Sequence, residues 1–430
     1  MIRPQLQEFM RRMDQKSVAI IPAAREATRS NDTQYRFRQD SDFYYLTGFE
    51  EPDAIAVIAP ASPHKYTLFV RPRDPEQEIW VGRRAGVEGA KSEFGAEESF
   101  PVAEFETRLQ DILDGAEKLY YRLGAYSDLD DAIIKKIASM RALNRKPIHP
   151  PRTIVDPATI VHEMRVLKST EEIELMQRAA DIAAEAHVEA MKAVRPGMKE
   201  YEVEALIEQI FRRAGAAGPS YTSIVGAGAN ATVLHYINND GELRDGELLL
   251  VDAGAEYKGY ASDITRTFPI NGRYSKAQRE IYDLVLETQM ACVEMVRPGV
   301  THDEIKSHSV ELLTAGMVKL GLLKGEPAEL IKEEKYKQFY MHGLGHMLGI
   351  DVHDVGLYYH DQESRALEAG VVMTVEPGIY IAPDTKDIPE QYLGIGVRIE
   401  DDVLCTANGP RVLTTGVPKD VGEIEALMAK

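Results

Sequence analysis

Histidines gather in one short segment of the chain. Four of the eleven lie within residues 342–360, at His342, His346, His353 and His360. An imidazole can bind a metal, carry a proton or donate a hydrogen bond near neutral pH, so such a cluster indicates a functional site. His342 and His346 have the spacing of a helical zinc motif. No glutamate follows His342, however, and glycines at 343, 345 and 349 each disfavour a helix by about 1 kcal/mol relative to alanine, so we predict a non-helical site.

Carboxylates stand where apolar runs end. Asp252 closes the run 247–252, and the turn at 258–259 leads into a second run, 260–268, that contains Asp263. We expect a β-hairpin that brings Asp252 and Asp263 side by side. Glu376 and Glu400 close the runs 371–376 and 394–400 in the same way. Strand periodicity places Arg398 on the same face as Glu400.

These four acids predict a metal site. A charge buried at the end of an apolar run costs several kcal/mol unless it is paired or coordinated, and the acids outnumber the nearby bases. Carboxylates and imidazoles without a thiolate favour a hard or borderline divalent ion, and the acids are numerous enough to bridge two ions. The two cysteines, Cys292 and Cys405, have neither zinc-knuckle nor redox spacing, and we expect them to be core thiols.

The elements that must position these residues divide into two parts. Between residues 17 and 123, short β-branched runs alternate with helical patterns, which is typical of an α/β unit. We predict strands at 18–21, 54–58, 66–70, 78–81 and 119–121 and a helix at 105–113. Proline and charge accumulate in 144–152, so we place a boundary between 145 and 165. The predicted domains are residues 1–165 and 166–430.

The second domain contains an internal repeat. The run 185–194 leads into Arg-Pro-Gly at 195–197, and 287–296 leads into Arg-Pro-Gly at 297–299, with a constant offset. Capping residues predict that a long helix begins at Ser169. Two helix, Pro-Gly, helix units separated by β-rich sequence predict two related α/β halves with a cleft at their junction.

Composition narrows the class of protein. The 430 residues are 44% hydrophobic and 28% charged, which is ordinary for a globular protein. A net charge of −19 repels nucleic acid and anionic membranes, so we expect neither as a partner. Charges interrupt the apolar residues of the first twelve positions, so we predict no signal peptide or membrane anchor and expect a cytoplasmic protein.

Four motifs together resemble a known family. The segments 252–267, 342–346, 375–378 and 396–401 are similar to the signature of pita-bread metallopeptidases, and within them to the Xaa-Pro aminopeptidases, also called aminopeptidase P. Residues 28–49 are similar to the N-terminal block of that family. The resemblance covers nearly the whole chain and implies an N-terminal α/β domain followed by a pita-bread domain with a pseudo-twofold repeat.

The resemblance also implies a reaction and its metals. The family releases the N-terminal residue from peptides with proline in the second position, and we expect a metal-bound hydroxide to attack the carbonyl before proline. Two divalent ions per chain, usually manganese, are implied, with Asp263 and Glu400 bridging them. The implied metal ligands are Asp252, Asp263, His346, Glu376 and Glu400.

Further roles are carried over by position. Glu376 is expected to shuttle a proton, and His353 or His235 to donate to the developing charge. His342, Arg398 and Tyr380 are expected to bind substrate. His360 matches nothing in the family, and we expect it to be structural.

Trp80, the only tryptophan, lies in the predicted strand 78–81. Ile79 and Val81 would supply a buried face, which turns Trp80 to the opposite face. The resemblance implies a homo-oligomer, a dimer or tetramer, in which N-terminal residues approach a neighbouring active site. We therefore predict that Trp80 lies at a subunit contact near the substrate cleft, with core packing as the alternative.

Other functions compete with this interpretation. Prolidase shares the ligand set, and hydrolysis of organophosphate esters is known among its relatives. The retained ligand types argue against a creatinase-like hydrolase and against a binding protein without a metal. A methionine aminopeptidase seldom carries an N-terminal domain of this kind. A dinucleotide-binding oxidoreductase would explain the glycines of 226–231, but it requires a helix after Ala231, where the sequence is β-like.

Overall fold

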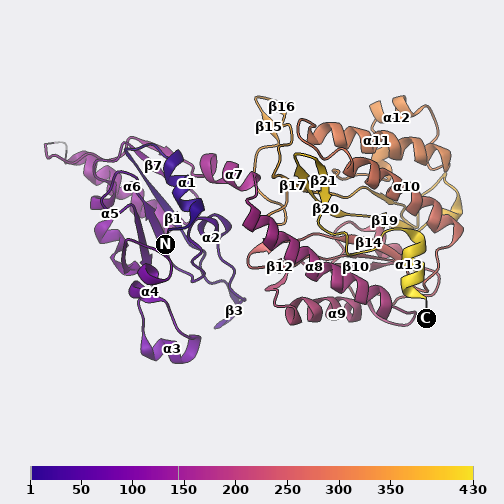
Figure 1. Ribbon diagram of the computed structural model, residues 1–430, viewed down its shortest axis with the longest axis horizontal. Coiled ribbons are helices and arrows are strands. Elements are labelled where there is room, and N and C mark those ends of the chain that lie inside the picture. The colour runs from indigo at the N-terminus through magenta and orange to yellow at the C-terminus, as the bar shows by residue number, and fades with distance from the viewer. Residues whose placement is uncertain (1, 144, 430) are drawn as a thin grey trace. The chain divides into compact units, whose positions relative to one another are not determined.

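The computed structural model describes residues 2–143 and 145–429. Three residues lie outside them: Met1, Lys430 and Asn144, the first residue of the proline- and charge-rich stretch 144–152. The chain divides into two compact units, residues 1–164 and 165–430 (Figure 1). Among the described residues, no helix is long and apolar enough to cross a membrane.

Unit 1 is built on a mixed six-stranded sheet with the order β6-β5-β4-β1-β7-β8. Its strands are β1 (Ser17–Pro22), β4 (Ile55–Ile58), β5 (Tyr66–Val70), β6 (Glu98–Pro101), β7 (Lys118–Tyr120) and β8 (Thr153–Val155), and β2 (Thr28–Ser30) and β3 (Thr33–Gln34) form a separate hairpin. Its helices are α1 (Pro4–Arg12), α2 (Ser41–Thr47), α3 (Pro75–Val81), α4 (Gly86–Ser92), α5 (Phe105–Leu113) and α6 (Ser127–Ala142), and α7 (Ala158–Val166) runs into unit 2. Apolar residues of β1 and β5 pack against α5 and α6 to form the core. The predicted α/β unit is confirmed.

The predicted strand at 78–81 is wrong, because these residues belong to helix α3. Asp74 caps that helix by accepting hydrogen bonds from the backbone N–H groups of residues 76 and 77, and Pro75 occupies the first turn. An Asp-Pro start and Gly82 at the end are stronger signals than the three β-formers Ile79, Trp80 and Val81. Ile79 and Val81, expected to be buried, are 81% and 63% exposed, and Trp80 is 85% exposed.

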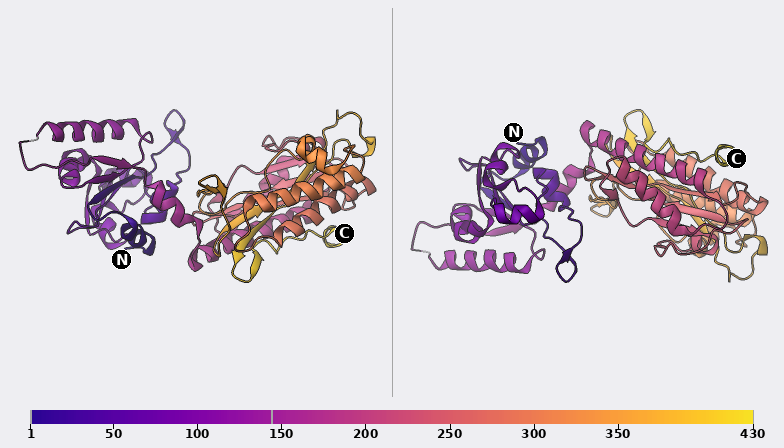
Figure 2. Two further views of the ribbon diagram at one scale, coloured as in Figure 1. Left: turned by 90° about the horizontal axis from the view of Figure 1, so that it is seen from above. Right: turned by 90° about the horizontal axis from the view of Figure 1, so that it is seen from below.

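Unit 2 consists of two halves with the same plan. The first half pairs α8 (Thr170–Ala193) with α9 (Glu200–Arg213) and holds the antiparallel sheet β10 (Ile224–Ala227), β11 (Leu248–Asp252) and β14 (Thr265–Pro269). The second pairs α10 (Lys276–Val293) with α11 (His302–Lys319) and holds β17 (Val372–Val375), β20 (Asp401–Thr406) and β21 (Gly409–Val412). Figure 2 shows each helix pair lying side by side, α10 and α11 in orange and α8 and α9 in magenta.

The remaining elements of unit 2 are short. They are α12 (Pro327–Lys332), α13 (Val421–Met428), β9 (Gly218–Pro219), β12 (Ala255–Tyr257), β13 (Tyr260–Ala261), β15 (Tyr359–His360), β16 (Glu363–Ser364), β18 (Gly378–Tyr380) and β19 (Gly396–Arg398). Strands β12 and β13 form the predicted hairpin, with its turn at Lys258 and Gly259, both at positive φ. Helix α8 begins as predicted, because the Ser169 side chain and Glu172 form a capping box.

The repeat is visible in the backbone itself. Gly197 and Gly299 have φ values of 91° and 90°, a left-handed conformation that favours glycine. The N–H of Gly197 donates to the carbonyl of Leu243 at 2.8 Å, and that of Gly299 donates to the carbonyl of Leu367 at 2.9 Å. The two Pro-Gly turns therefore make equivalent hydrogen bonds in both halves, and the predicted internal repeat is confirmed.

Candidate active site

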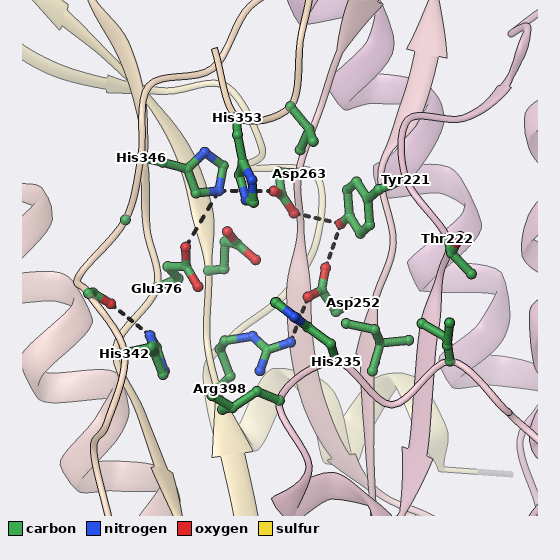
Figure 3. Close-up of a pocket in the computed structure, with 17 residues that line it drawn as sticks. Tyr221, Thr222, His235, Asp252, Asp263, His342, His346, His353, Glu376 and Arg398 are labelled. Carbon is green, nitrogen blue, oxygen red and sulfur yellow. Dashed lines mark hydrogen bonds and ion pairs between the residues drawn. The ribbon is translucent and has the colours of Figure 1, made fainter. Parts of the chain in front are cut away.

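The cleft of unit 2 holds a cavity of about 400 Å³ with charged and imidazole side chains on its wall (Figure 3). Both halves contribute to this wall. The lining includes Tyr221, His235, Asp252, Asp263, His342, His346, His353, Glu376, Arg398 and Glu400. Every predicted site residue except Tyr380 and Trp80 therefore lines one cavity.

The hairpin of the first half supplies two acids. Asp252 is the last residue of β11, and its backbone pairs with Thr265 at the start of β14. Asp263 lies just before β14, and the Tyr221 hydroxyl is 2.5 Å from one oxygen of each acid. A phenol has one proton to donate, so both contacts are hydrogen bonds only when one carboxyl is protonated. The hairpin thus places the two acids together, as predicted.

The second half supplies His346 and Glu376 from two segments that lie side by side. The residues around His346 are not helical: the N–H of Leu348 donates to the carbonyl of Val372, and the carbonyl of Leu344 accepts from the N–H of Glu376. A Cβ on Gly345 would stand 2.1 Å from the carbonyl oxygen of Thr374, so only glycine allows this close approach. The Nε2 atom of His346 lies 3.5 Å from Asp263 and 3.6 Å from Glu376.

The tautomer of His346 suits a ligand. Its Nδ1 lies 3.1 Å from the carbonyl oxygen of Met347, to which only an N–H can donate. That bond places a proton on Nδ1 and directs Nε2 at the acids (Figure 3). Nε2 is therefore the nitrogen of His346 that is placed to bind a metal.

Arg398 organises the polar wall through three nitrogens. Its guanidinium donates to Asp252 at 2.6 Å, to the Thr265 hydroxyl at 3.1 Å and to the Tyr380 hydroxyl at 3.0 Å. The Thr265 hydroxyl in turn donates to Glu400 at 2.6 Å. Arg398 therefore orients one acid directly and a second through a threonine.

The acids repel one another in the absence of a cation. Burial, followed by the charges of neighbouring acids, raises the pKa of Asp263 and of Glu400 well above the usual range. Burial and the charge of Glu400 raise the pKa of Glu376 to about 8. One ligand atom each from Asp263, His346 and Glu400 lies within 4.8 Å of the others. This donor set fits a divalent cation, which would remove the repulsion.

Three further histidines surround the acids (Figure 3). Burial lowers the pKa of His342 to about 4, and burial also lowers the pKa of His353. The His353 ring lies edge-on to that of His346, with 4.3 Å between centroids. His342 Nδ1 contacts the carbonyl of Gly343 at 2.7 Å, so its Nε2 accepts from the Tyr380 hydroxyl at 2.8 Å. Both nitrogens of His342 are therefore engaged, whereas a neutral His353 has an N–H that can donate a hydrogen bond to a developing negative charge.

Sequence reasoning missed two residues and misplaced one element. Tyr221 and Thr265 contact the acids, but neither stands at the end of an apolar run or in a cluster of its own kind. Trp80 lies in unit 1, on helix α3 and not on a strand. His360 lies in the exposed strand β15 and does not line the cavity.

The helix that a dinucleotide fingerprint requires is not there. Residues Gly228–Thr232 form one short 3₁₀ turn, and the described chain continues from Val233 without an α-helix until α10. That alternative is therefore excluded by the local fold.

Comparison with known proteins defines the class. The model of metallopeptidase family M24 matches residues 174–407, and that of the aminopeptidase P N-terminal domain matches residues 3–120. The chain is 48% identical to an Xaa-Pro aminopeptidase of Escherichia coli, over 98% of this chain and 97% of the relative. Accordingly, the chain belongs to metallopeptidase family M24 and is a hydrolase.

Solved structures agree in both sequence and fold. An aminopeptidase of Pseudomonas aeruginosa has a TM-score of 0.97 and 49% identity, covering 99% of this chain and 96% of that one. A zinc-substituted Escherichia coli aminopeptidase P in complex with product has a TM-score of 0.95 and 47% identity, with the same coverage of both chains. The likeness extends over both units.

Proposed function

We propose that this protein is a metal-dependent aminopeptidase that releases the N-terminal residue from peptides with proline in the second position. One observation carries the proposal: acids and an imidazole from the two halves of a pita-bread fold converge on one cavity that further histidines line. The relatives that match both units over nearly the full chain are Xaa-Pro aminopeptidases, which favours this activity over prolidase.

The proposed metal site holds two divalent ions, with manganese as the native metal. Asp252, Asp263, His346, Glu376 and Glu400 would hold these ions. The raised pKa values of three of these acids support the site, because buried carboxylates that repel one another are stabilised by a shared cation. When bound, the ions supply Lewis acidity toward the scissile carbonyl and activate the attacking water.

The protein residues have separate proposed tasks. Glu376, which lies on the cavity wall, takes a proton of the attacking water and passes it to the leaving proline nitrogen. His353 and His235 stand on the cavity wall and donate hydrogen bonds to the charge that develops on the carbonyl oxygen. Arg398 and His342 line the wall against which the substrate binds, and the Tyr380 hydroxyl links these two side chains from outside the cavity lining.

We further propose that the catalytic domain comprises residues 166–430 and that the N-terminal domain, residues 1–165, serves assembly. Apolar side chains in contact with water raise the free energy of the protein. The exposed side chains of Ile79, Trp80 and Val81 on α3 therefore support a contact with a second copy of this chain. The proposed assembly is a dimer or tetramer. The cytoplasmic location stays a prediction, to be checked by cell fractionation.

The test compares two substrate classes with the manganese-loaded protein. Tripeptides of the type Xaa-Pro-Yaa and dipeptides Xaa-Pro are offered at equal concentrations, and the released amino acid is quantified. The proposal predicts a higher kcat/KM for the longer peptides. Preference for the dipeptides would indicate prolidase, and an enzyme that cleaves neither would refute the proposal.

A further inference from the structure

A buried cluster of charges lies directly beside His353 in the sequence. The carboxylate of Asp354 accepts from Arg165 Nη2 at 2.5 Å and from Lys168 Nζ at 3.0 Å. These three side chains are only 1% or 2% exposed. Arg165 also donates to Asp351 at 2.7 Å, so two cations meet two anions. None of these four residues lines the cavity.

Stability alone is a weak reason for such a cluster. Desolvating buried ions is costly, and apolar residues of the same size often stabilise a core as well or better. What a charge cluster provides is a defined geometry, because each partner must sit at hydrogen-bond distance. Such a cluster can therefore hold a nearby segment of the backbone in place.

Asp354 closes the loop that runs from His346 to His353. Its own N–H donates to the carbonyl of Met347 at 2.9 Å, which folds residues 347–354 back on themselves. A Cβ on Gly349 would stand 2.1 Å from Asp354 Oδ2 and 3.0 Å from Lys168 Cε, so the loop backbone packs directly against the cluster. The carboxylate thus fills the inside of this loop.

His353 depends on this loop for its position. Its ring faces His346 across 4.3 Å, and in the part of the chain that the structure describes no protein hydrogen bond fixes its nitrogens. The side chain is exposed at the cavity wall, so packing restrains it little. The backbone of 347–354, set by Asp354, is what determines where His353 points.

We propose that Asp354, held by Arg165 and Lys168, is a positioning residue that sets His353 for the peptidase reaction. This inference rests on the proposed function, because it assigns His353 a role in that reaction. The cations come from the end of α7 and from the connection to α8, and the N–H of Lys168 donates to the carbonyl of Gly370 at 2.9 Å. The cluster is thereby anchored to rigid elements, as precise positioning requires.

The first test removes one cation without adding a new charge. Lys168→Met should lower kcat by about tenfold, because a displacement of the order of 1 Å costs up to about 10² in rate. KM and bound manganese per chain should stay unchanged, since neither the substrate wall nor the ligands are touched. The matched control is Arg213→Met, which removes a cation from an exposed pair with Glu185 and should leave all three quantities as they were.

The second test asks whether the effect passes through His353. In a His353→Ala background, Lys168→Met should cause no further loss of kcat, whereas a purely structural role would add its full loss. Gly349→Ala, which displaces Asp354 sterically and changes no charge, should reproduce the kcat loss if Lys168→Met does not fold. An additive loss in the double variant, or wild-type kcat in Lys168→Met or Gly349→Ala, would overturn the inference. Failure of the proposed function would appear differently, as an unmodified enzyme inactive on Xaa-Pro peptides.

Discussion

At the scale of single residues, the acids of the cleft carry protons that a metal would displace. Glu376 has a pKa of about 8 in the metal-free protein, against 4.5 ordinarily. The folded state therefore binds a proton that the unfolded state has lost, and the free energy of unfolding falls as pH rises toward 8. His342 and His353, whose pKa values are lowered, oppose this trend only below about pH 6.5.

We therefore expect metal-free protein to unfold at a lower temperature at pH 8 than at pH 6.5. Manganese should weaken or reverse this dependence, because metal binding favours the deprotonated acids. The unfolding temperature is measured as a function of pH, once in chelator and once in excess manganese. Glu376→Gln should reduce the pH dependence in chelator. A metal-free protein that is more stable at pH 8 would contradict the assignment.

His353 is the residue whose role is easiest to separate from metal binding. It lies beside His346 but outside the proposed ligand set. Replacement by alanine should lower kcat by about 10² through the lost transition-state hydrogen bond, with KM and metal content little changed. Steady-state kinetics with metal analysis provides the check, and His360→Ala on exposed β15 is the control. Loss of metal from the His353→Ala variant would instead indicate that His353 is a metal ligand.

At the scale of elements, a glycine decides how the histidine segment packs on β17. An alanine at Gly345 would collide with the Thr374 carbonyl at 2.1 Å and push His346 away from the acids. We expect Gly345→Ala to destabilise the fold by about 1–3 kcal/mol and to weaken metal binding. Calorimetry measures the first effect and metal titration the second. Gly343→Ala is the control for stability, because an added Cβ there meets nothing within 4 Å, and an equal loss in both variants would refute the packing argument.

Element patterns show what a sequence can predict. Apolar runs that end in acids, a turn at Lys258 and Gly259, and glycines beside His346 all carry local signals, and these predictions are confirmed. Tyr221 and Thr265 carry no such signal, because their roles arise from contacts between distant segments. The strand at 78–81 failed for another reason: the helix start at Asp74 and Pro75 outweighs a run of β-formers.

At the scale of the whole molecule, the repeat explains why the site lies where it does. Two halves of equal plan, marked by the Pro-Gly turns at 196–197 and 298–299, contribute acids from their strand ends to one cleft. The repeat was visible in the sequence and predicted this cleft. Assembly of several chains would leave no periodic pattern in the sequence, so the proposal of an oligomer depends on the exposed residues of α3.

Trp80 provides the test of assembly. Because it is 85% exposed, Trp80→Ala should leave thermal stability of the isolated chain and metal content nearly unchanged. A contact near a neighbouring cleft predicts that the substitution weakens assembly, or raises KM for long peptides more than KM for dipeptides. Light scattering and paired KM measurements test this, with Tyr201→Ala, another exposed aromatic, as the control. Unaltered assembly and KM would remove Trp80 from the interface.

Metal stoichiometry against activity tests the central claim most directly. Chelated protein is titrated with manganese while bound metal per chain and hydrolysis of an Xaa-Pro-Yaa peptide are followed together. We expect no activity without metal, and activity that rises as occupancy approaches two ions per chain. Asp263→Ala and Glu400→Ala should each lower both the metal occupancy and the rate. A fully active metal-free protein, or unchanged occupancy in both variants, would contradict the account.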